Sequence, residues 1–128
     1  MTFPDKRQPT VLEKAIIERL LIDAIPEVEF LKEQLSSCHV RVIDEFGSLM
    51  IQPAEGAPIW PLDYSGPLVT AYQADFHTTD IGPFINFILF VERGVMKELQ
   101  IYRDDGARPN VTYDPKKFAL VTTSMPRL

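Results

Sequence analysis

The segment "DFHTTD", residues 75–80, brings together the side-chain types that acid–base and metal chemistry need. If a strand runs through it, Asp75 and His77 lie on one face and Asp80 follows just beyond. A carboxylate beside an imidazole can move a proton, and a second carboxylate lets such a group hold a divalent ion. No second histidine lies at ligand spacing on a neighbouring expected strand. The alternative is a hydrated strand end with an Asp-containing turn, so we assign no metal site and no catalytic residue here.

The nucleophilic side chains give no stronger signal. Cys38 is the only cysteine, and a thiol needs a nearby base or a positive environment to react, so we expect a buried, inert thiol in this apolar strand entry. Ser48 lies in "GSL", which lacks the second glycine of a G-x-S-x-G elbow, and single scattered glycines form no phosphate-binding loop. No cofactor is indicated. A small enzyme or ligand-binding protein with a pocket around Asp75, His77 and Tyr102 stays open as the alternative function.

The single tryptophan, Trp60, lies in "APIWPLDYSGP", residues 57–67, among three prolines. Such a segment suits neither a helix nor a central strand. One interpretation is a rigid lid over the open face of a sheet, because proline reduces the entropy lost on ordering. A second is that Trp60 and Tyr64 are exposed anchors for a partner. A third is that a second copy of the chain, in a homodimer, covers that face.

The acidic residues are unevenly distributed along the chain. The formal net charge is −5, and residues 42–92 contain seven acids but no lysine or arginine. Proteins that bind nucleic acid cluster basic residues, so the pattern argues against nucleic acid as a partner. It favours a basic protein partner, although folding can also disperse acids that segregate by chance. The candidate partner-binding residues are Trp60, Asp63, Tyr64, Asp75, His77 and Asp80.

Two helices are expected first, at residues 11–24 and 26–37. Thr10 and Glu13 form a capping-box pattern at the start of the first helix. Pro26 ends that helix and suits the first turn of the next one. Apolar residues recur at helical spacing along both segments, which indicates one buried face on each.

Strands follow in "HVRVI", "SLMIQ", "LVTAYQADFHT", "GPFINFILFVE" and "MKELQIYR", and "ALVTT" is a candidate sixth strand. The fourth strand is apolar at both odd and even positions, which predicts a central strand covered on both faces. Because two helices cover one face only, something else must cover the other. The expected fold is α+β, with two N-terminal helices packed on one face of an antiparallel meander of five strands, or six if "ALVTT" joins.

The length is that of one domain, residues 1–128. We expect a flexible N-terminus at 1–9, a proline-rich loop at 55–67 and a tail at 107–128. The N-terminal segment lacks the apolar core of a secretory signal, and the run "FINFILFV" is far shorter than the about 20 residues that cross a bilayer. A single cysteine is typical of a reducing compartment. These features predict a cytoplasmic protein with no membrane partner.

The hairpin "IDEFGSLMI" and the later block "FILFVERGVMKELQIYRDDG" resemble a family of small, functionally uncharacterised bacterial proteins. In that family two helices precede a "GSL" hairpin, and a later strand reads "ELxIY". Here "GSL" occupies residues 47–49 and "ELQIY" residues 98–102. The resemblance implies the same α+β architecture, but it brings no catalytic residues. The proline-rich segment and the basic tail lie outside it.

The leading hypothesis is a non-catalytic protein-binding module that uses an acidic surface and the Trp60 loop. One concrete form is an immunity-type inhibitor, since small acidic α+β proteins also occur among the immunity proteins of bacterial toxin systems. Its acids would meet a basic toxin surface and accelerate association. An enzyme is the less favoured class.

Overall fold

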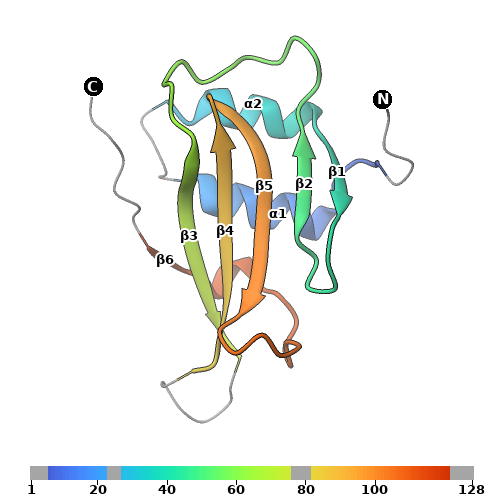
Figure 1. The fold of residues 1–128 in the computed structure, drawn as a ribbon, viewed down its shortest axis with the longest axis vertical. Helices are drawn as coiled ribbons and strands as arrows, with labels where there is room; N and C mark the ends of the chain where they lie inside the picture. Colours follow the sequence, from blue (N-terminus) through green and yellow to red (C-terminus); the bar gives the residue numbers. More distant parts are fainter. Residues whose placement is uncertain (1–5, 23–26, 76–81, 122–128) are drawn as a thin grey trace.

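The computed structural model describes residues 6–22, 27–75 and 82–121. Figure 1 shows these as two layers, an antiparallel sheet with two helices behind it. The helices are α1 (Val11–Leu21), α2 (Glu29–Ser37) and the short 3-10 helix η1 (Pro115–Lys117). The strands are β1 (His39–Val42), β2 (Leu49–Gln52), β3 (Gly66–Ala74), β4 (Phe84–Glu92), β5 (Val95–Arg103) and β6 (Ala119–Val121). The expected α+β fold, with the sixth strand formed, is confirmed.

The strand order in the sheet is β1-β2-β5-β4-β3-β6, and neighbouring strands are antiparallel. β3, β4 and β5 form the expected meander, but β2 pairs with β5 rather than with β3. Residues 53–65 therefore carry the chain across one end of the sheet, as Figure 1 shows. The expected continuous meander is wrong at this point. A short turn determines that the two strands of a hairpin pair with each other, but it does not determine which strands pair with the outer sides of that hairpin.

The start of α1 folds as its sequence indicates. The Thr10 hydroxyl accepts a hydrogen bond from the Glu13 backbone N–H at 3.1 Å, and the Glu13 carboxylate accepts one from the Thr10 N–H at 2.9 Å. This is the expected capping box. The same carboxylate binds Arg7 at 2.7 and 2.8 Å, and the Arg7 backbone pairs with Val40 of β1. Arg7, in the segment expected to be flexible, is therefore held against the fold.

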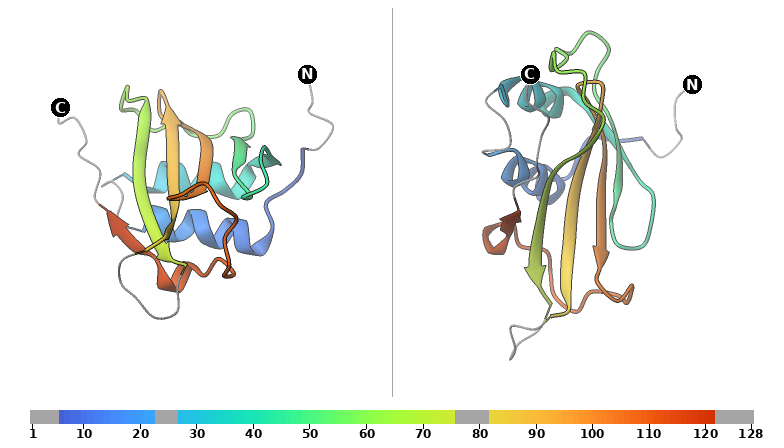
Figure 2. Two further views of the ribbon diagram at one scale, coloured as in Figure 1. Left: turned by 60° about the horizontal axis from the view of Figure 1, so that its bottom comes forward. Right: turned by 60° about the vertical axis from the view of Figure 1, so that its left-hand side comes forward.

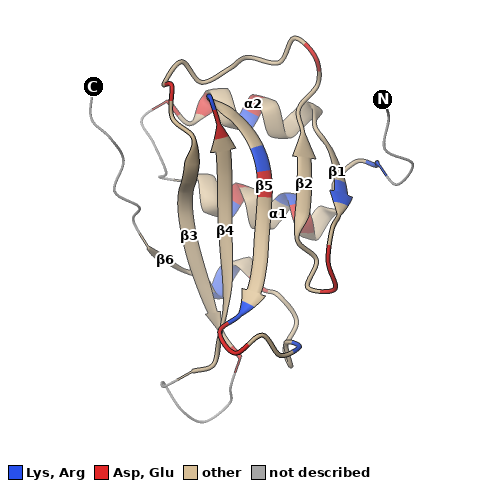
Figure 3. Ribbon diagram, in the orientation of Figure 1, with Lys and Arg blue, Asp and Glu red and all other residues tan. Residues whose placement is uncertain are grey.

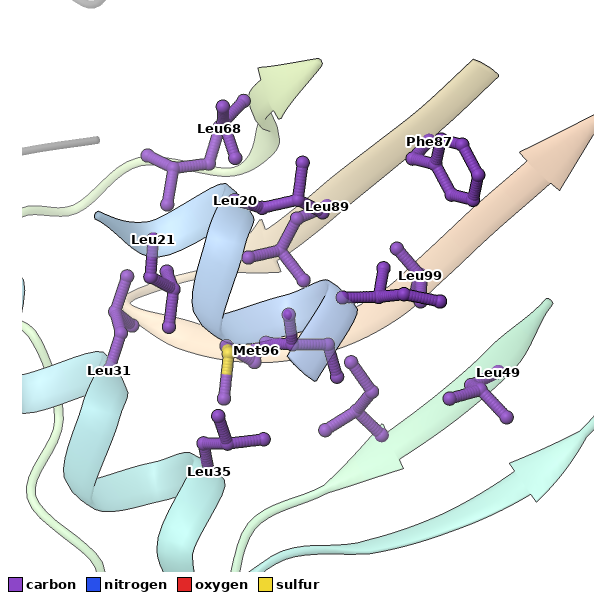
Figure 4. Packing of buried hydrophobic residues seen from close by; sticks show 14 of the residues in the cluster. Leu20, Leu21, Leu31, Leu35, Leu49, Leu68, Phe87, Leu89, Met96 and Leu99 are labelled. Atoms are coloured by element: carbon purple, nitrogen blue, oxygen red, sulfur yellow. The ribbon is translucent and has the colours of Figure 1, made fainter. Parts of the chain in front are cut away.

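The core lies between the helices and the sheet. Figure 4 shows side chains of α1 and α2 pointing toward the strands. The buried residues of this contact include Leu20, Leu21, Leu31, Leu35, Leu89, Met96 and Leu99. Burying one such side chain stabilises the fold by about 1.5–3 kcal/mol relative to exposure, so this contact between layers is a main source of stability. Neither helix is long and apolar enough to cross a membrane within the described residues.

β4 shows the two faces of the sheet most clearly. Its side chains on the helix side are buried: Ile85, Phe87, Leu89 and Val91. Its alternate side chains are half-buried: Phe84, Asn86, Ile88 and Phe90. Figure 2 shows α1 and α2 on the same side of the sheet. Within the described chain the helices cover one face of β4 only, and neighbouring side chains shield its second face.

Residues 107–121 return to the sheet instead of leaving it. Phe118 is buried and stacks on Phe87 of β4, with ring centres 4.3 Å apart. β6 pairs with β3, which places Leu120 opposite Ala71. The described part of the expected tail thus belongs to the folded domain.

Candidate functional site

Trp60 belongs to the core rather than to the surface. Its side chain is 3% exposed, and its backbone N–H donates to the Gly94 carbonyl, in the turn between β4 and β5, at 3.1 Å. Tyr64 is half-buried, and its hydroxyl donates to the Pro67 carbonyl at 2.6 Å. The lid interpretation correctly predicts that Trp60 is buried. It wrongly places the segment over the open face of the sheet, because the segment closes one end of the two-layer core. Trp60 as an exposed anchor is wrong.

One buried polar side chain holds residues 57–67, which we call the Trp60 segment, in place. Gln34 of α2 donates from Nε2 to the Pro58 carbonyl at 2.9 Å and to the Gly94 carbonyl at 2.8 Å. Its Oε1 accepts from the Met96 N–H at 2.9 Å. Both amide donors and the amide acceptor are therefore used. Gln34 was not among the residues predicted from the sequence, although a polar residue on the apolar stripe of α2 is a signal that could have identified it.

Asp75 is buried and has structural partners. Both carboxylate oxygens accept from the Asn110 backbone N–H, each at 2.9 Å. The carboxylate also lies 3.5 Å from Arg103 Nε, which lies 3.2 Å from the Asp105 carboxylate. These are ion pairs rather than aligned hydrogen bonds. Asp75 ties the end of β3 to β5 and to residues 107–114, so its assignment to a partner-binding surface is wrong.

We expect Asp75→Asn to lower the free energy of unfolding by about 1–2 kcal/mol. The amide oxygen still accepts from the Asn110 N–H, but the charge beside Arg103 is lost. Urea unfolding at neutral pH measures the change. The matched control is Asp63→Asn, an exposed acid whose replacement is expected to cost less than about 0.5 kcal/mol. Equal losses in the two variants would refute the structural role of Asp75.

The other site residues named from the sequence do not assemble where the structure describes them. Asp63 precedes β3 and Asp75 follows it, so a nine-residue strand of about 30 Å separates them. Tyr102 is paired with Asn86 and shares its face, which points away from the helices. Asp75 instead contacts Arg103, the residue after Tyr102, whose partner Ile85 is buried on the helix side. The described residues therefore form no pocket shared by Asp75 and Tyr102. His77 and Asp80 lie outside the described residues.

The candidate nucleophiles take part in structural contacts. Cys38 is buried, its thiol donates to the Leu35 carbonyl at 3.4 Å, and burial raises the pKa of the thiol. Ser48 is also buried; its hydroxyl donates to the Ile101 carbonyl at 3.1 Å and accepts from the Ile101 N–H at 2.8 Å. Among the described residues, no three His, Cys, Asp or Glu side chains form a group that could hold a metal ion.

Tyr113 gives a prediction for alkaline pH. Its hydroxyl donates to the Phe46 carbonyl at 2.6 Å, and burial, followed by the charges of Asp44 and Asp75, raises its pKa to about 12. An unfolded tyrosine has a pKa of about 10. The stability from the protonated hydroxyl is thus complete below pH of about 10 and is lost as the pH rises through about 12.

We therefore expect wild type to lose stability in this pH interval more steeply than Tyr113→Phe, because phenylalanine has no proton to release. Urea unfolding at several alkaline pH values measures both slopes, and lysine titration contributes equally to each chain. Equal slopes would contradict the assignment.

The sheet face that points away from the helices carries large apolar side chains among neutral polar ones. We call it the open face, and its large apolar side chains are Met50, Tyr72, Phe84, Ile88, Phe90 and Tyr102. Tyr72 and Tyr102 flank Asn86 on neighbouring strands, and the Tyr72 and Phe84 rings meet edge to face with centres 5.1 Å apart. Tyr72 is 36% exposed and Tyr102 38%. The register thus joins these side chains into one surface.

Charged side chains are few on the open face. Figure 3 shows β3 free of charged residues and β4 charged at its end only. Lys6, Arg41 and Lys97 line a hollow of about 190 Å³ beside Met50. They are balanced by three acids: Glu98, opposite Phe90 in β5, Glu92 at the end of β4, and Asp104, whose carboxylate accepts from Asn86 Nδ2. In a chain of net charge −5, the strands of this face are nearly neutral.

A second surface hollow, of about 790 Å³, lies on the helix layer between α1, α2 and η1. Glu18 is the acid among its described lining residues. The cations there are Lys14, Arg19, Lys32 and Lys116. Two of these cations are engaged, since Lys32 lies 3.7 Å from Glu29 and Arg19 donates to the Phe118 carbonyl at 3.5 Å.

Comparisons of the chain with protein-family models, with curated proteins and with solved structures found no match. The resemblance to a family of uncharacterised bacterial proteins therefore stays an expectation. The surfaces of the chain itself carry the functional inference that follows.

Proposed function

We propose that this chain is a non-catalytic protein-binding domain and that it binds through the open face of its sheet. The observation that carries the proposal is a group of large apolar side chains on one face of the sheet, interspersed with neutral polar residues, which the described chain leaves uncovered: Phe84, Ile88 and Phe90 of β4 with Tyr72 and Tyr102. Apolar side chains gathered on one exposed face mark sites of protein interaction in soluble proteins. Tyrosine and phenylalanine supply large contact areas at low entropic cost and are enriched in interfaces.

This proposal keeps the expected class of function but moves its surface. The Trp60 segment has Trp60 buried, and the carboxylate of Asp75 is held by Asn110 and Arg103. Neither is available to a partner without local unfolding. The open face needs no rearrangement to make contact, because its side chains already stand on paired strands.

A non-catalytic role is supported by what the described reactive groups do. Asp75, Cys38 and Ser48 are buried and serve to join segments of the fold. A catalytic group must instead reach a substrate in a concave site with a matched pKa. The thiol of Cys38 has its pKa shifted upward, which disfavours the reactive thiolate.

The proposal is tested by placing a photoreactive phenylalanine analogue at Tyr72 or Tyr102 and irradiating cells of the native host. The matched control positions are Glu33, exposed on α2, and Glu18, in the hollow of the helix layer. We expect a discrete covalent protein adduct from the two tyrosine positions and none from the two glutamate positions. No adduct from the open face, or the same adduct from all four positions, would contradict the proposal.

A further inference from the structure

We infer that the partner of the open face is a second copy of this chain, bound in a symmetric dimer with the two sheets face to face. The inference rests on the proposed function and names its partner. Two sheets packed in this way lie about 10 Å apart, with strand directions within about 30° of each other. A two-fold axis places the same patch of both copies in contact. The assembly would have four layers, with helices outside and sheets inside.

The composition of β4 supports a second sheet as the cover. Within β4 only Asn86 and the final residue, Glu92, are polar. Strands with apolar residues on both faces are typical of sheets covered on both sides. In a single copy, Ile88 and Phe90 remain half-buried beside exposed tyrosines. A second copy of the face would remove these side chains from water, which is the main driving force for association.

The low net charge of the open face favours self-association through it. Two copies of a chain with net charge −5 repel each other, and the repulsion is smallest where the meeting surfaces are neutral. β3 contains no charged residue. The acids Glu92, Glu98 and Asp104 of this face are offset by Lys6, Arg41 and Lys97. A strongly basic partner therefore meets no net acidic charge on the open face. A second copy meets little repulsion there.

The size of the face approaches that of a stable dimer interface. The sheet has six strands, and β3, β4 and β5 have nine residues each. With strands about 4.8 Å apart and about 3.3 Å per residue, the face spans roughly 600 Å² in projection. Stable interfaces bury about 800 Å² on each partner.

The polar groups under the contact do not oppose it. Asn86 Nδ2 donates to the Asp104 carboxylate at 2.7 Å, so burial leaves this donor paired. Thr70 and Gln100 flank Ile88 on the adjacent strands. Both are neutral side chains that can donate and accept hydrogen bonds across a two-fold axis.

Sedimentation equilibrium of the purified full chain tests the inference, at concentrations from about 1 to about 100 μM. We expect a dimer whose dissociation constant falls as salt rises, because salt screens the repulsion between two acidic chains. Ile88→Lys and Thr70→Lys are expected to raise the dissociation constant at least about tenfold. Thr70→Lys guards against a folding defect, since it replaces a polar side chain. The matched control is Ile59→Lys, at a side chain that is 58% exposed on the proline-rich segment.

Three results would overturn the dimer: a monomer at every concentration and salt, a dimer that salt weakens, or a dimer broken by Ile59→Lys but not by the open-face variants. A monomer in solution together with a photo-adduct of a different protein at Tyr102 would refute the dimer and leave the proposed function standing. A monomer without any open-face adduct would refute both.

Discussion

Gly94→Ala is expected to lower the free energy of unfolding by about 4 kcal/mol or more, a loss that few single substitutions cause. Gly94 has φ of +79°, and a Cβ there would overlap with the carbonyl oxygen of Trp60. The Gly94 carbonyl also accepts from the Trp60 N–H and from Gln34 Nε2. Any movement that relieves the overlap must therefore break contacts that hold the Trp60 segment.

The matched control for this variant is Gly106→Ala. Gly106 has φ of +76°, but a Cβ there meets no atom within 4 Å. It therefore reports the backbone strain alone, which is about 1–2 kcal/mol. Urea unfolding followed by Trp60 fluorescence measures both variants. If the two lose the same stability, the close packing of the Trp60 segment on the β4–β5 turn is refuted.

Gln34→Leu is expected to lower the free energy of unfolding by about 3 kcal/mol. Leucine fits the apolar stripe of α2, so loss of packing is small. However, the Met96 N–H and the Pro58 carbonyl lose their partner, and a buried unpaired backbone group costs about 1–3 kcal/mol. The Gly94 carbonyl keeps the Trp60 N–H.

The control for this second variant is Gln52→Leu, an exposed glutamine at the end of β2, for which we expect a change within about 0.5 kcal/mol. Thermal or urea unfolding distinguishes the two. The role of Gln34 is refuted if its leucine variant is as stable as wild type. Because Gln34 and Gly94 share a hydrogen bond, their effects should be less than additive in the double variant.

The parts of the fold that were predictable depend on neighbours in sequence. The capping box of Thr10 and Glu13, the buried stripes of both helices and the hairpin at Gly47 each follow from the types of residues a few positions apart. The alternation in β4 also placed Phe87 and Ile88 on opposite faces, as the structure does. Such signals are local because capping, helical spacing and strand alternation act within one element.

The parts that failed depend on contacts between segments far apart in the chain. Asp75 looked like a surface acid because its partners, Arg103 and Asn110, lie 28 and 35 positions away. Trp60 was placed over the wrong part of the sheet because nothing local reveals that β2 pairs with β5. The apolar residues on both faces of β4 did indicate that both faces are covered. In the described chain only the helix side is covered, and the open face is the other side.

The measurement that tests the central claim most directly is covalent carbene footprinting of the open face. The chain is labelled once as a dilute purified protein and once in an extract of its native cells. The account predicts that Met50, Tyr72 and Phe90 lose labelling in the extract, while Ile59 and Val11, exposed elsewhere, are labelled equally in both. Equal labelling of the open face in both samples, or protection at Ile59 instead, would contradict it.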